Sequence, residues 1–178
     1  FGRKILLNYH SGEAEDHLRR WRRSTKWVLK LVDKVAVPSE FLVRVFAKFG
    51  VDACAIFNII DLERFEFRER TPLRPVFLSN RNLEAHYGVD CILRAFALIQ
   101  QQIPEASLTV VGNGRQRQAL ETLKSELNLQ HTTFTGRVEH DDILEHYRAS
   151  DIFLNASRVD NQPLSIIEAF ACGLPVVT

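Results

Sequence analysis

Hydrophobic and polar positions form two kinds of run along the chain. Short runs rich in Val, Ile, Leu and Phe are typical of buried strands, and runs with apolar residues three or four apart are typical of amphipathic helices. The first kind predicts strands at 4–9, 34–38, 53–57, 76–79, 107–111, 132–135, 151–154 and 174–178. The second kind predicts helices at 13–32, 39–50, 88–102, 115–128, 139–149 and 163–172. This alternation predicts an α/β fold with parallel, Rossmann-like sheets.

The periodicity is lost at residues 58–75, which end in two prolines. We therefore expect residues 1–66 to belong to a first domain, 67–75 to be a linker and 76–178 to form a second domain. The first strand has no predecessor, and "LPVVT" at the end has no following helix. Because parallel strands are normally covered on both faces, we expect a piece of a two-domain protein, truncated at both ends.

Composition excludes several classes of protein. The chain has 178 residues, 46% hydrophobic and 25% charged, which is typical of globular domains. It has no apolar run of 18 residues and no secretory signal pattern, so we expect a cytoplasmic protein. Its three cysteines (Cys54, Cys91 and Cys172) lack zinc-site spacing and lie in apolar runs, which predicts buried thiols.

Positive charge is concentrated near the beginning of the chain. Residues 1–33 hold eight Lys or Arg and four Asp or Glu, although the net charge of the whole chain is only +1. The predicted helix 13–32 has an apolar stripe of Leu18, Trp21, Val28 and Val32 flanked by basic residues. Such a helix can lie on an anionic membrane as a peripheral contact at its inner face. A basic, solvated face on a core-packed helix is commoner, so we expect membrane contact to be weak at most.

Polar loops follow four successive strands of the second domain. They read "SNRNLEAHYG", "GNGR", "GRVE" and "NASRVDNQP". In open parallel sheets, ligands bind at the carboxyl ends of the strands, where these loops would meet. The alternative is that they are polar only because surface loops usually are. In "GNG", Gly112 and Gly114 would let the backbone approach a ligand, or would simply form a tight strand-to-helix turn.

The tail "VDNQPLSIIEAFACG" carries the strongest chemical signal. Pro163 suits the first position of a helix, which leaves the N–H groups of Leu164 and Ser165 available to a phosphate. Glu168 follows about one turn later, among apolar residues. A carboxylate there would bind hydroxyl groups, such as a ribose diol. Arg81 could supply positive charge to a diphosphate. These groups together predict a nucleotide site.

Four segments of the second domain together resemble a known family. They are "SNRNLEAHYGVDCILRAF", "LTVVGNGRQRQALE", "FTGRVEHDDILEHYRASDIFLNAS" and "DNQPLSIIEAFACGLPVV". They are similar to the donor half of glycosyltransferase family four, the group 1 glycosyltransferases. The resemblance implies a fold of the GT-B type and sugar transfer from a nucleotide diphosphate with retention at the anomeric carbon. The upstream "VAVPSEFLVRVFAKFG" resembles the end of the family's first domain.

The resemblance also implies roles for individual residues. Asp160 matches the acid that faces the donor sugar, and "NYHSG" makes His10 a second catalytic candidate. Glu168 matches the acid that holds the ribose hydroxyls, and Arg81 the arginine that binds the diphosphate. The remaining implied donor contacts are Gly112, Gly114, Val138 (which touches the base), Asn161, Gln162, Pro163 and Leu164.

The chain departs from the family pattern at three positions. Asp160 replaces the usual Glu, and Tyr87 replaces the lysine that contributes a cation to the diphosphate site. In the aperiodic segment 58–75, Ile59 stands where the family has glycine. These changes keep a second hypothesis open, a nucleotide-binding module without catalytic activity. A GT-B epimerase acting on nucleotide sugars is a third.

The leading hypothesis is a metal-independent hexosyltransferase with no cofactor, in which helix dipoles and arginine stabilise the departing diphosphate. Its partners would be a nucleotide-sugar donor and a glycan, lipid or small-molecule acceptor, such as those of polysaccharide biosynthesis, and not nucleic acid. Because the GT-B active site lies between two domains, we expect this fragment alone to be inactive.

Overall fold

The computed structural model describes residues 2–178, apart from the side chain of Arg22. It divides into two compact units. Unit 1 comprises residues 1–59 and 159–163, and unit 2 comprises residues 60–158 and 164–178. The loop 159–163 therefore belongs to unit 1, although it lies in the sequence between two elements of unit 2.

Unit 1 is a three-stranded parallel sheet in the order β1-β2-β3. Its elements are β1 (Leu6–Asn8), α1 (Ala14–Arg20), α2 (Arg22–Leu29), β2 (Lys34–Val37), α3 (Glu40–Lys48) and β3 (Ala53–Ala55). The helix predicted at 39–50 is confirmed as α3, and Ser39 caps its beginning, because the Ser39 hydroxyl accepts a hydrogen bond from the Leu42 N–H at 3.2 Å. The core of the unit lies between α1, α3 and β2, around Leu18, Leu42 and Phe46.

The prediction of one helix over 13–32 is wrong. The backbone leaves the helical region at Trp21 (φ −108°, ψ 30°), where α1 ends and α2 begins. The break lets α1 pack through Ala14 and Leu18 into the core that it shares with α3. Trp21 and Val28, expected in one apolar stripe, are 58% and 46% exposed. The break leaves hydrogen bonds such as that from the Thr25 N–H to the Trp21 oxygen in place, so the apolar spacing of the sequence does not change there and gives no sign of it.

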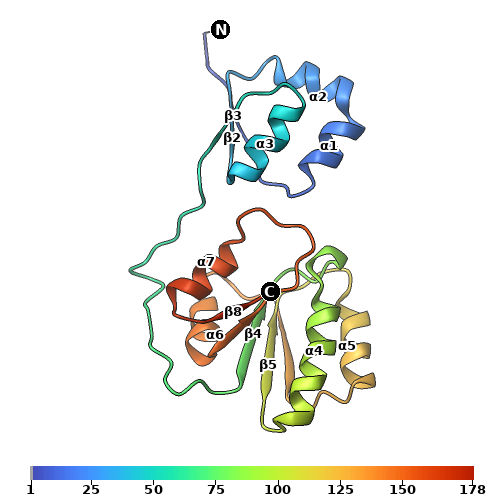
Figure 1. Cartoon of the computed structure of the whole chain (residues 1–178), viewed down its shortest axis with the longest axis vertical. Coiled ribbons are helices and arrows are strands. Elements are labelled where there is room, and N and C mark those ends of the chain that lie inside the picture. Colours follow the sequence, from blue (N-terminus) through green and yellow to red (C-terminus); the bar gives the residue numbers. More distant parts are fainter. Residues whose placement is uncertain (1) are drawn as a thin grey trace. The chain divides into compact units, whose positions relative to one another are not determined.

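Unit 2 is a five-stranded parallel sheet in the order β6-β5-β4-β7-β8. Its elements are β4 (Val76–Asn80), the 3₁₀ turn η1 (Ala85–Tyr87), α4 (Val89–Gln102), β5 (Ser107–Val111), α5 (Arg117–Glu126), β6 (Thr132–Gly136), α6 (Ile143–Ala149), β7 (Ile152–Leu154), α7 (Leu164–Ala171) and β8 (Val176–Val177). Helices α4 and α5 cover one face of the sheet and α6 and α7 the other (Figure 1). The predicted α/β fold with parallel, Rossmann-like sheets is confirmed.

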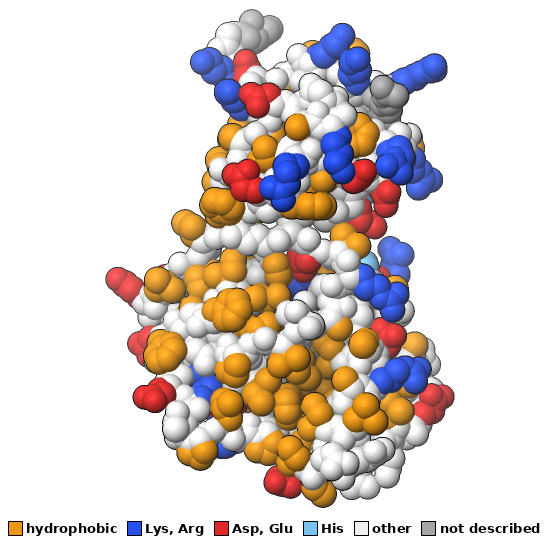
Figure 2. Space-filling view, in the orientation of Figure 1, with side chains coloured by type: hydrophobic (Ala, Val, Ile, Leu, Met, Phe, Trp, Pro, Cys, Tyr) orange, Lys and Arg blue, Asp and Glu red, His pale blue; other side chains and the backbone are white. Residues whose placement is uncertain are grey.

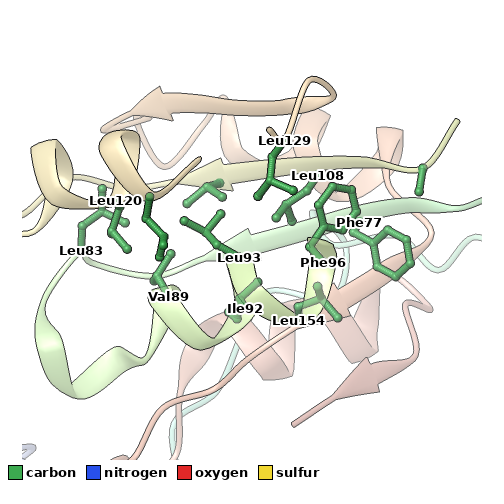
Figure 3. Packing of buried hydrophobic residues seen from close by; sticks show 13 residues of the cluster. Phe77, Leu83, Val89, Ile92, Leu93, Phe96, Leu108, Leu120, Leu129 and Leu154 are labelled. Carbon is green, nitrogen blue, oxygen red and sulfur yellow. The ribbon is translucent and has the colours of Figure 1, made fainter. Parts of the chain in front are cut away.

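The alternation of side chains along β4 explains the two cores of unit 2. Phe77 packs with Leu93 and Phe96 of α4 on one face (Figure 3), and its neighbour Leu78 packs against α6 and α7 on the other. A strand buried on both faces reads as a continuous apolar run, as "PVFL" does. Residues 60–75 have no helix or strand and belong to unit 2.

Two further sequence expectations need correction. Of the three cysteines only Cys172 is buried, whereas Cys54 and Cys91 are exposed. Cys91 lies on the side of α4 away from its buried residues, and Cys54 lies on the side of β3 opposite to the partly buried Ala53 and Ala55. The first residue of α7 is Leu164, so Pro163 precedes the helix instead of occupying its first position. No helix within residues 2–178 is both long enough and apolar enough to span a bilayer.

Candidate functional site

A polar cleft of about 850 Å³ opens at the carboxyl ends of β4, β5 and β6 in unit 2. Residues that follow these strands line it, and the first turns of α6 and α7 complete its wall. The lining residues are Asn80, Arg81, Asn82, Tyr87, Val111, Gly112, Asn113, Gly114, Arg137, Val138, Glu139, His140, Ile143, Leu164, Ser165 and Glu168. The expectation that the loops after successive strands converge at one edge is confirmed, because the fourth loop leaves the same end of the parallel sheet and its Arg158 N–H donates to the His86 oxygen of the first loop at 2.8 Å.

Six of the predicted donor-site residues line this cleft: Arg81, Gly112, Gly114, Val138, Leu164 and Glu168. The fourth predicted loop contributes nothing to its wall. Asp160, Asn161, Gln162 and Pro163 belong to unit 1, as does His10. The sequence-predicted residues therefore form two groups, one in each unit.

Glu168 is the buried acid of the cleft. Its side chain lies in α7 and is only 6% exposed. The hydroxyl of Tyr147, on α6, donates a hydrogen bond to Glu168 Oε2 at 2.8 Å. Tyr147 is fully buried, and this burial, followed by the nearby Glu168 charge, raises the pKa of its phenol well above the usual range. The phenol thus keeps its proton and remains a donor to the carboxylate.

Arg81 is the partly buried cation of the cleft, and the exposed Arg137 also lines it. Its Nη1 donates to the hydroxyl of Ser165, in the first turn of α7, at 3.1 Å. Its guanidinium also lies over the ring of Tyr87, with Cζ 4.4 Å from the ring centroid. Burial lowers the pKa of Arg81 from its usual value, but an arginine remains charged at neutral pH. Tyr87, which the resemblance places at the position of the family's lysine, therefore contacts the predicted diphosphate-binding arginine.

Gly112 and Gly114 are required by packing between two loops. Gly112 has φ +130°, and a Cβ there would collide with the carbonyl oxygen of Arg81. A Cβ on Gly114 would lie 2.5 Å from the carbonyl oxygen of Leu83. Hydrogen bonds join the same loops, from the Leu83 N–H to the Asn113 oxygen at 3.0 Å and from the Arg81 N–H to the Val111 oxygen at 3.1 Å. The glycines thus fix the position of the loop that carries Arg81.

The first turn of α7 brings positive backbone potential to the cleft. Leu164, 46% exposed, and the buried Ser165 are its first two residues, and both line the cleft. The N–H groups of a first turn lack helical partners, and the helix dipole favours an anion there. An anionic group at this end of the cleft would therefore meet both backbone N–H groups and Arg81.

Buried Arg70 hydrogen-bonds to backbone carbonyl oxygens at the carboxyl-terminal ends of α6 and α7. It donates to the carbonyl oxygens of Tyr147 (2.9 Å), Ser150 (2.9 Å) and Cys172. Asp151, only 1% exposed, accepts hydrogen bonds from Arg68 at 2.6 Å and from Arg74 at 2.8–2.9 Å. Hydrogen bonds from Arg74, the largest influence, lower the pKa of Asp151 well below its usual range. Sequence reasoning missed this network, although three arginines within seven residues were a visible signal.

In unit 1 the structure brings the two catalytic candidates into one hydrogen-bonded group. The side-chain amide of Asn161 donates to the backbone oxygen of His10 at 2.9 Å. The carboxylate of Asp160 accepts the Asn161 N–H at 2.9 Å. Gln162 is held separately, since its backbone oxygen accepts a hydrogen bond from the side chain of Asn58 at 2.8 Å. His10 and Asp160 are thus neighbours of the same asparagine.

The described residues 2–178 contain no group of three His, Cys, Asp or Glu side chains arranged to hold a metal ion. Sequence reasoning also missed Tyr147, Asn80 and the hydroxyl of Ser165 as parts of the cleft's hydrogen-bond network, although it had named the Ser165 N–H as a phosphate-binding group. Tyr147 falls at a core position of the helical pattern and therefore reads as packing alone. The signal in the sequence was Glu168, because an acid among apolar residues indicates a hydrogen-bond donor near it.

The sequence and the fold both have known relatives. Residues 63–178 match the family model described as glycosyl transferases group 1. The chain is 33% identical over 114 residues to a GDP-mannose-dependent monoacylated alpha-(1-6)-phosphatidylinositol monomannoside mannosyltransferase of Corynebacterium glutamicum, covering 60% of this chain and 30% of that protein. It is 26% identical over 193 residues to a sulfoquinovosyl transferase of Arabidopsis thaliana, covering 97% of this chain and 37% of that protein.

A solved structure shares the fold. Sucrose-phosphate synthase from Thermosynechococcus elongatus superposes with a TM-score of 0.80 at 24% identity, covering 99% of this chain and 50% of that one. The chain spans about a third of the length of the curated relatives named above. The family model covers most of the chain, including every residue that lines the cleft. The chain therefore belongs to the group 1 glycosyltransferases, whose GT-B fold its parallel sheets share.

Proposed function

We propose that the protein containing this chain is a retaining glycosyltransferase, and that the cleft of unit 2 binds its nucleoside-diphosphate sugar. The observation that carries the proposal is the pairing of opposite charges in one cleft. Glu168 offers a buried carboxylate to hydroxyl hydrogens, and Arg81 offers a guanidinium to phosphate oxygens. A nucleoside diphosphate presents both kinds of group, a ribose diol and a diphosphate.

The two charged groups lie against the same residue, which supports recognition of one ligand. Ser165 accepts a hydrogen bond from Arg81 through its hydroxyl, and its backbone oxygen lies 3.1 Å from the Tyr147 hydroxyl that also contacts Glu168. The ribose would lie toward Glu168 and the diphosphate toward Arg81 and the first turn of α7. Val138, on the cleft wall, is then available to the base.

Transfer exchanges one bond at the anomeric carbon of the sugar. The bond to the diphosphate oxygen breaks, and its electron pair leaves with the nucleoside diphosphate. A bond to the acceptor oxygen forms, and the acceptor hydroxyl passes its proton to the departing diphosphate oxygen. Asp160 and His10 are the residues of this chain proposed to face the reacting sugar, as the family resemblance implies. Retention of configuration rests on the same resemblance.

Relatives support the choice of donor class. The corynebacterial relative is named as GDP-mannose-dependent, and its name gives a phosphatidylinositol mannoside as acceptor. We accordingly propose a nucleotide-sugar donor and a glycan, lipid or small-molecule acceptor. Helix N-termini and arginine can stabilise a departing diphosphate without a metal ion. Arg81 and α7 provide both in this cleft, so we propose that transfer needs no divalent cation.

A transfer assay tests the proposal. The protein that contains this chain is incubated with UDP- or GDP-linked hexoses and a mixture of glycan and glycolipid acceptors, with and without EDTA. We expect a glycoside that retains the donor's anomeric configuration, formed equally well in both conditions. An inverted product would contradict retention, and activity lost in EDTA and restored by Mg²⁺ or Mn²⁺ would contradict metal independence. Nucleotide binding without any product would favour a binding module, and an isomerised free donor would favour an epimerase.

A further inference from the structure

Beneath the cleft, a fully buried phenol contacts the acid proposed to bind ribose. Tyr147 donates from its hydroxyl to Glu168 Oε2 at 2.8 Å, and its oxygen accepts a hydrogen bond from the side-chain amide of Asn80 at 3.1 Å. Asn80 ends β4, Tyr147 lies in α6 and Glu168 lies in α7. Side chains from three different elements of unit 2 thus form one series of hydrogen bonds that ends at the Glu168 carboxylate.

The directions of these hydrogen bonds determine which oxygen of the Glu168 carboxylate can bind a ligand. A phenol has one proton to donate and lone pairs to accept. With Asn80 donating to the Tyr147 oxygen, the phenol proton is directed away from Asn80, toward Glu168 Oε2 and the Ser165 carbonyl oxygen at 3.1 Å. Oε2 is then occupied, and Oε1 remains available to a ligand in the cleft. A carboxylate fixed by one oxygen presents the other in a defined direction.

We infer that Tyr147 is a positioning residue for ribose recognition, which holds the Glu168 carboxylate so that it accepts hydrogen bonds from the 2′- and 3′-hydroxyls of the donor. The inference rests on the proposed function, since it concerns how the proposed donor is recognised. Tyr147 itself is fully buried and does not line the cleft. It acts through Glu168 and does not touch the ligand.

Several features support a positioning role beyond simple packing. The ring of Tyr147 stacks on Phe153 with centroids 6.0 Å apart and meets Phe65 edge-on at 6.0 Å. Phenylalanine would satisfy both ring contacts, so packing alone does not call for a hydroxyl. Burial raises the pKa of the phenol, which keeps the donor protonated next to a carboxylate. A buried donor aimed at a buried acid implies that the acid must be held in one orientation.

The test compares ribose and dideoxyribose ligands in a Tyr147→Phe variant of the full chain. Calorimetry measures the dissociation constants of UDP and GDP and of their 2′,3′-dideoxy counterparts. Wild type should prefer the ribonucleotide, and in Tyr147→Phe that preference should fall by about tenfold, the effect of one hydrogen bond to a charged group. Affinity for the dideoxynucleotide, whose contacts are to the base and phosphates, should be unchanged.

Phe153→Leu is the matched control, because it alters the ring stacked on Tyr147 and leaves the hydroxyl in place. It should preserve the ribose preference. An equal loss of affinity for both ligands in Tyr147→Phe would mean that Tyr147 is only structural and would overturn the inference. An unchanged preference would overturn it as well. If wild type binds neither ribonucleotide, the proposed function fails and the inference fails with it.

A measurement on wild type covers the case in which Tyr147→Phe does not fold. With ¹³C-labelled tyrosine, the Tyr147 hydroxyl proton should give a slowly exchanging, downfield NMR signal. This signal should shift when the ribonucleotide is added and remain in place when the dideoxynucleotide is added. A signal that responds equally to both ligands, or to neither, contradicts the inference.

Discussion

The guanidinium of Arg81 lies over the aromatic ring of Tyr87, 4.4 Å from its centroid. The family resemblance implies a lysine at the position of Tyr87, and in this chain the ring supports Arg81 instead of adding a second cation. The ring and the Ser165 hydroxyl together restrict the orientation of Arg81 at the edge of the cleft. This relationship leads to a prediction about phosphate binding.

Tyr87→Leu should weaken binding of UDP or GDP by about 1 kcal/mol, the strength of a partly exposed cation–π contact. The affinity for the corresponding nucleoside should not change, because Arg81 is proposed to contact phosphate and not the base or ribose. Tyr87→Phe is the control, since it keeps an aromatic face under the guanidinium. Calorimetry of the diphosphates and NMR titration of the nucleosides would measure both effects. A similar loss for nucleoside and diphosphate would show that Tyr87 supports the cleft in some other way.

Asp151→Asn should destabilise unit 2 by about 3 kcal/mol at pH 7, since it leaves the buried guanidinium of Arg70 without its nearby charge. Urea unfolding would measure the change. The control is Glu66→Gln, which removes an exposed ion pair with Arg148 and should cost less than about 1 kcal/mol.

The effect of Asp151 should depend on pH in one direction. Its pKa is lower in the folded chain than in the unfolded chain, so its contribution is fully present above the unfolded value of about 3.9. The contribution is lost as pH falls below that value toward the folded pKa. The stability gap between wild type and Asp151→Asn should therefore narrow as the pH is lowered from about 5 to 3. A gap that stays constant or widens over this range would contradict the ion-pair account.

Membrane contact through α1 and α2 should be weak. Figure 2 shows many Lys and Arg side chains on unit 1, and Trp21 and Trp27 are 58% and 67% exposed. However, the helix breaks at Trp21 into pieces of seven and eight residues, so no long apolar face lies beside the basic residues. Sedimentation with vesicles containing anionic lipid should recover little protein at 0.15 M salt. Tight, salt-sensitive binding that is lost on neutralising Arg19, Arg20 and Arg23 would show that this expectation is wrong.

The 178-residue chain by itself should bind nucleotide without transferring sugar. It spans 30–37% of the length of the curated relatives described above. Positioning both reactants can lower a barrier by about 7–11 kcal/mol, so a chain that orders only the donor should show no measurable turnover. Parallel assays of this chain and of the longer protein that contains it would test the difference. Glycoside formed by the 178-residue chain would refute the expectation.

Most of the fold could be predicted from the sequence, because buried residues recur along the chain with the spacing of the helix or strand that contains them. Runs such as "LTVV" are apolar on both faces, and Ser39 marks a helix start by a local hydrogen bond. The end of α1 at Trp21 could not be predicted, because the apolar spacing typical of a helix continues through this residue. Elements are also shorter than predicted, and α6, for example, begins at Ile143 and not at residue 139.

The residues of the cleft that could be predicted are those whose charge or polarity differs from that of their neighbours in the sequence. Glu168 among isoleucines and an arginine directly after a strand both indicate chemistry. Tyr147 fits its apolar surroundings and gives no such conflict, so its hydrogen bond to Glu168 emerges only from the three-dimensional packing of α6 against α7. The assignment of residues 159–163 to unit 1 was equally hidden, since it depends on contacts distant in sequence such as that of Asn161 with His10.

Calorimetric titration of UDP and GDP into wild type and Glu168→Gln tests the central claim most directly, because the claim is that the unit 2 cleft binds a nucleoside diphosphate. Glu121→Gln, on an exposed acid of α5 outside the cleft, is the control. We predict that wild type binds at least one of the two nucleotides and that Glu168→Gln weakens this binding by about 1–3 kcal/mol, as expected for hydrogen bonds to a charged group. The control should bind as wild type does. Equal affinity in wild type and Glu168→Gln, or no binding of either nucleotide to wild type, would contradict the account.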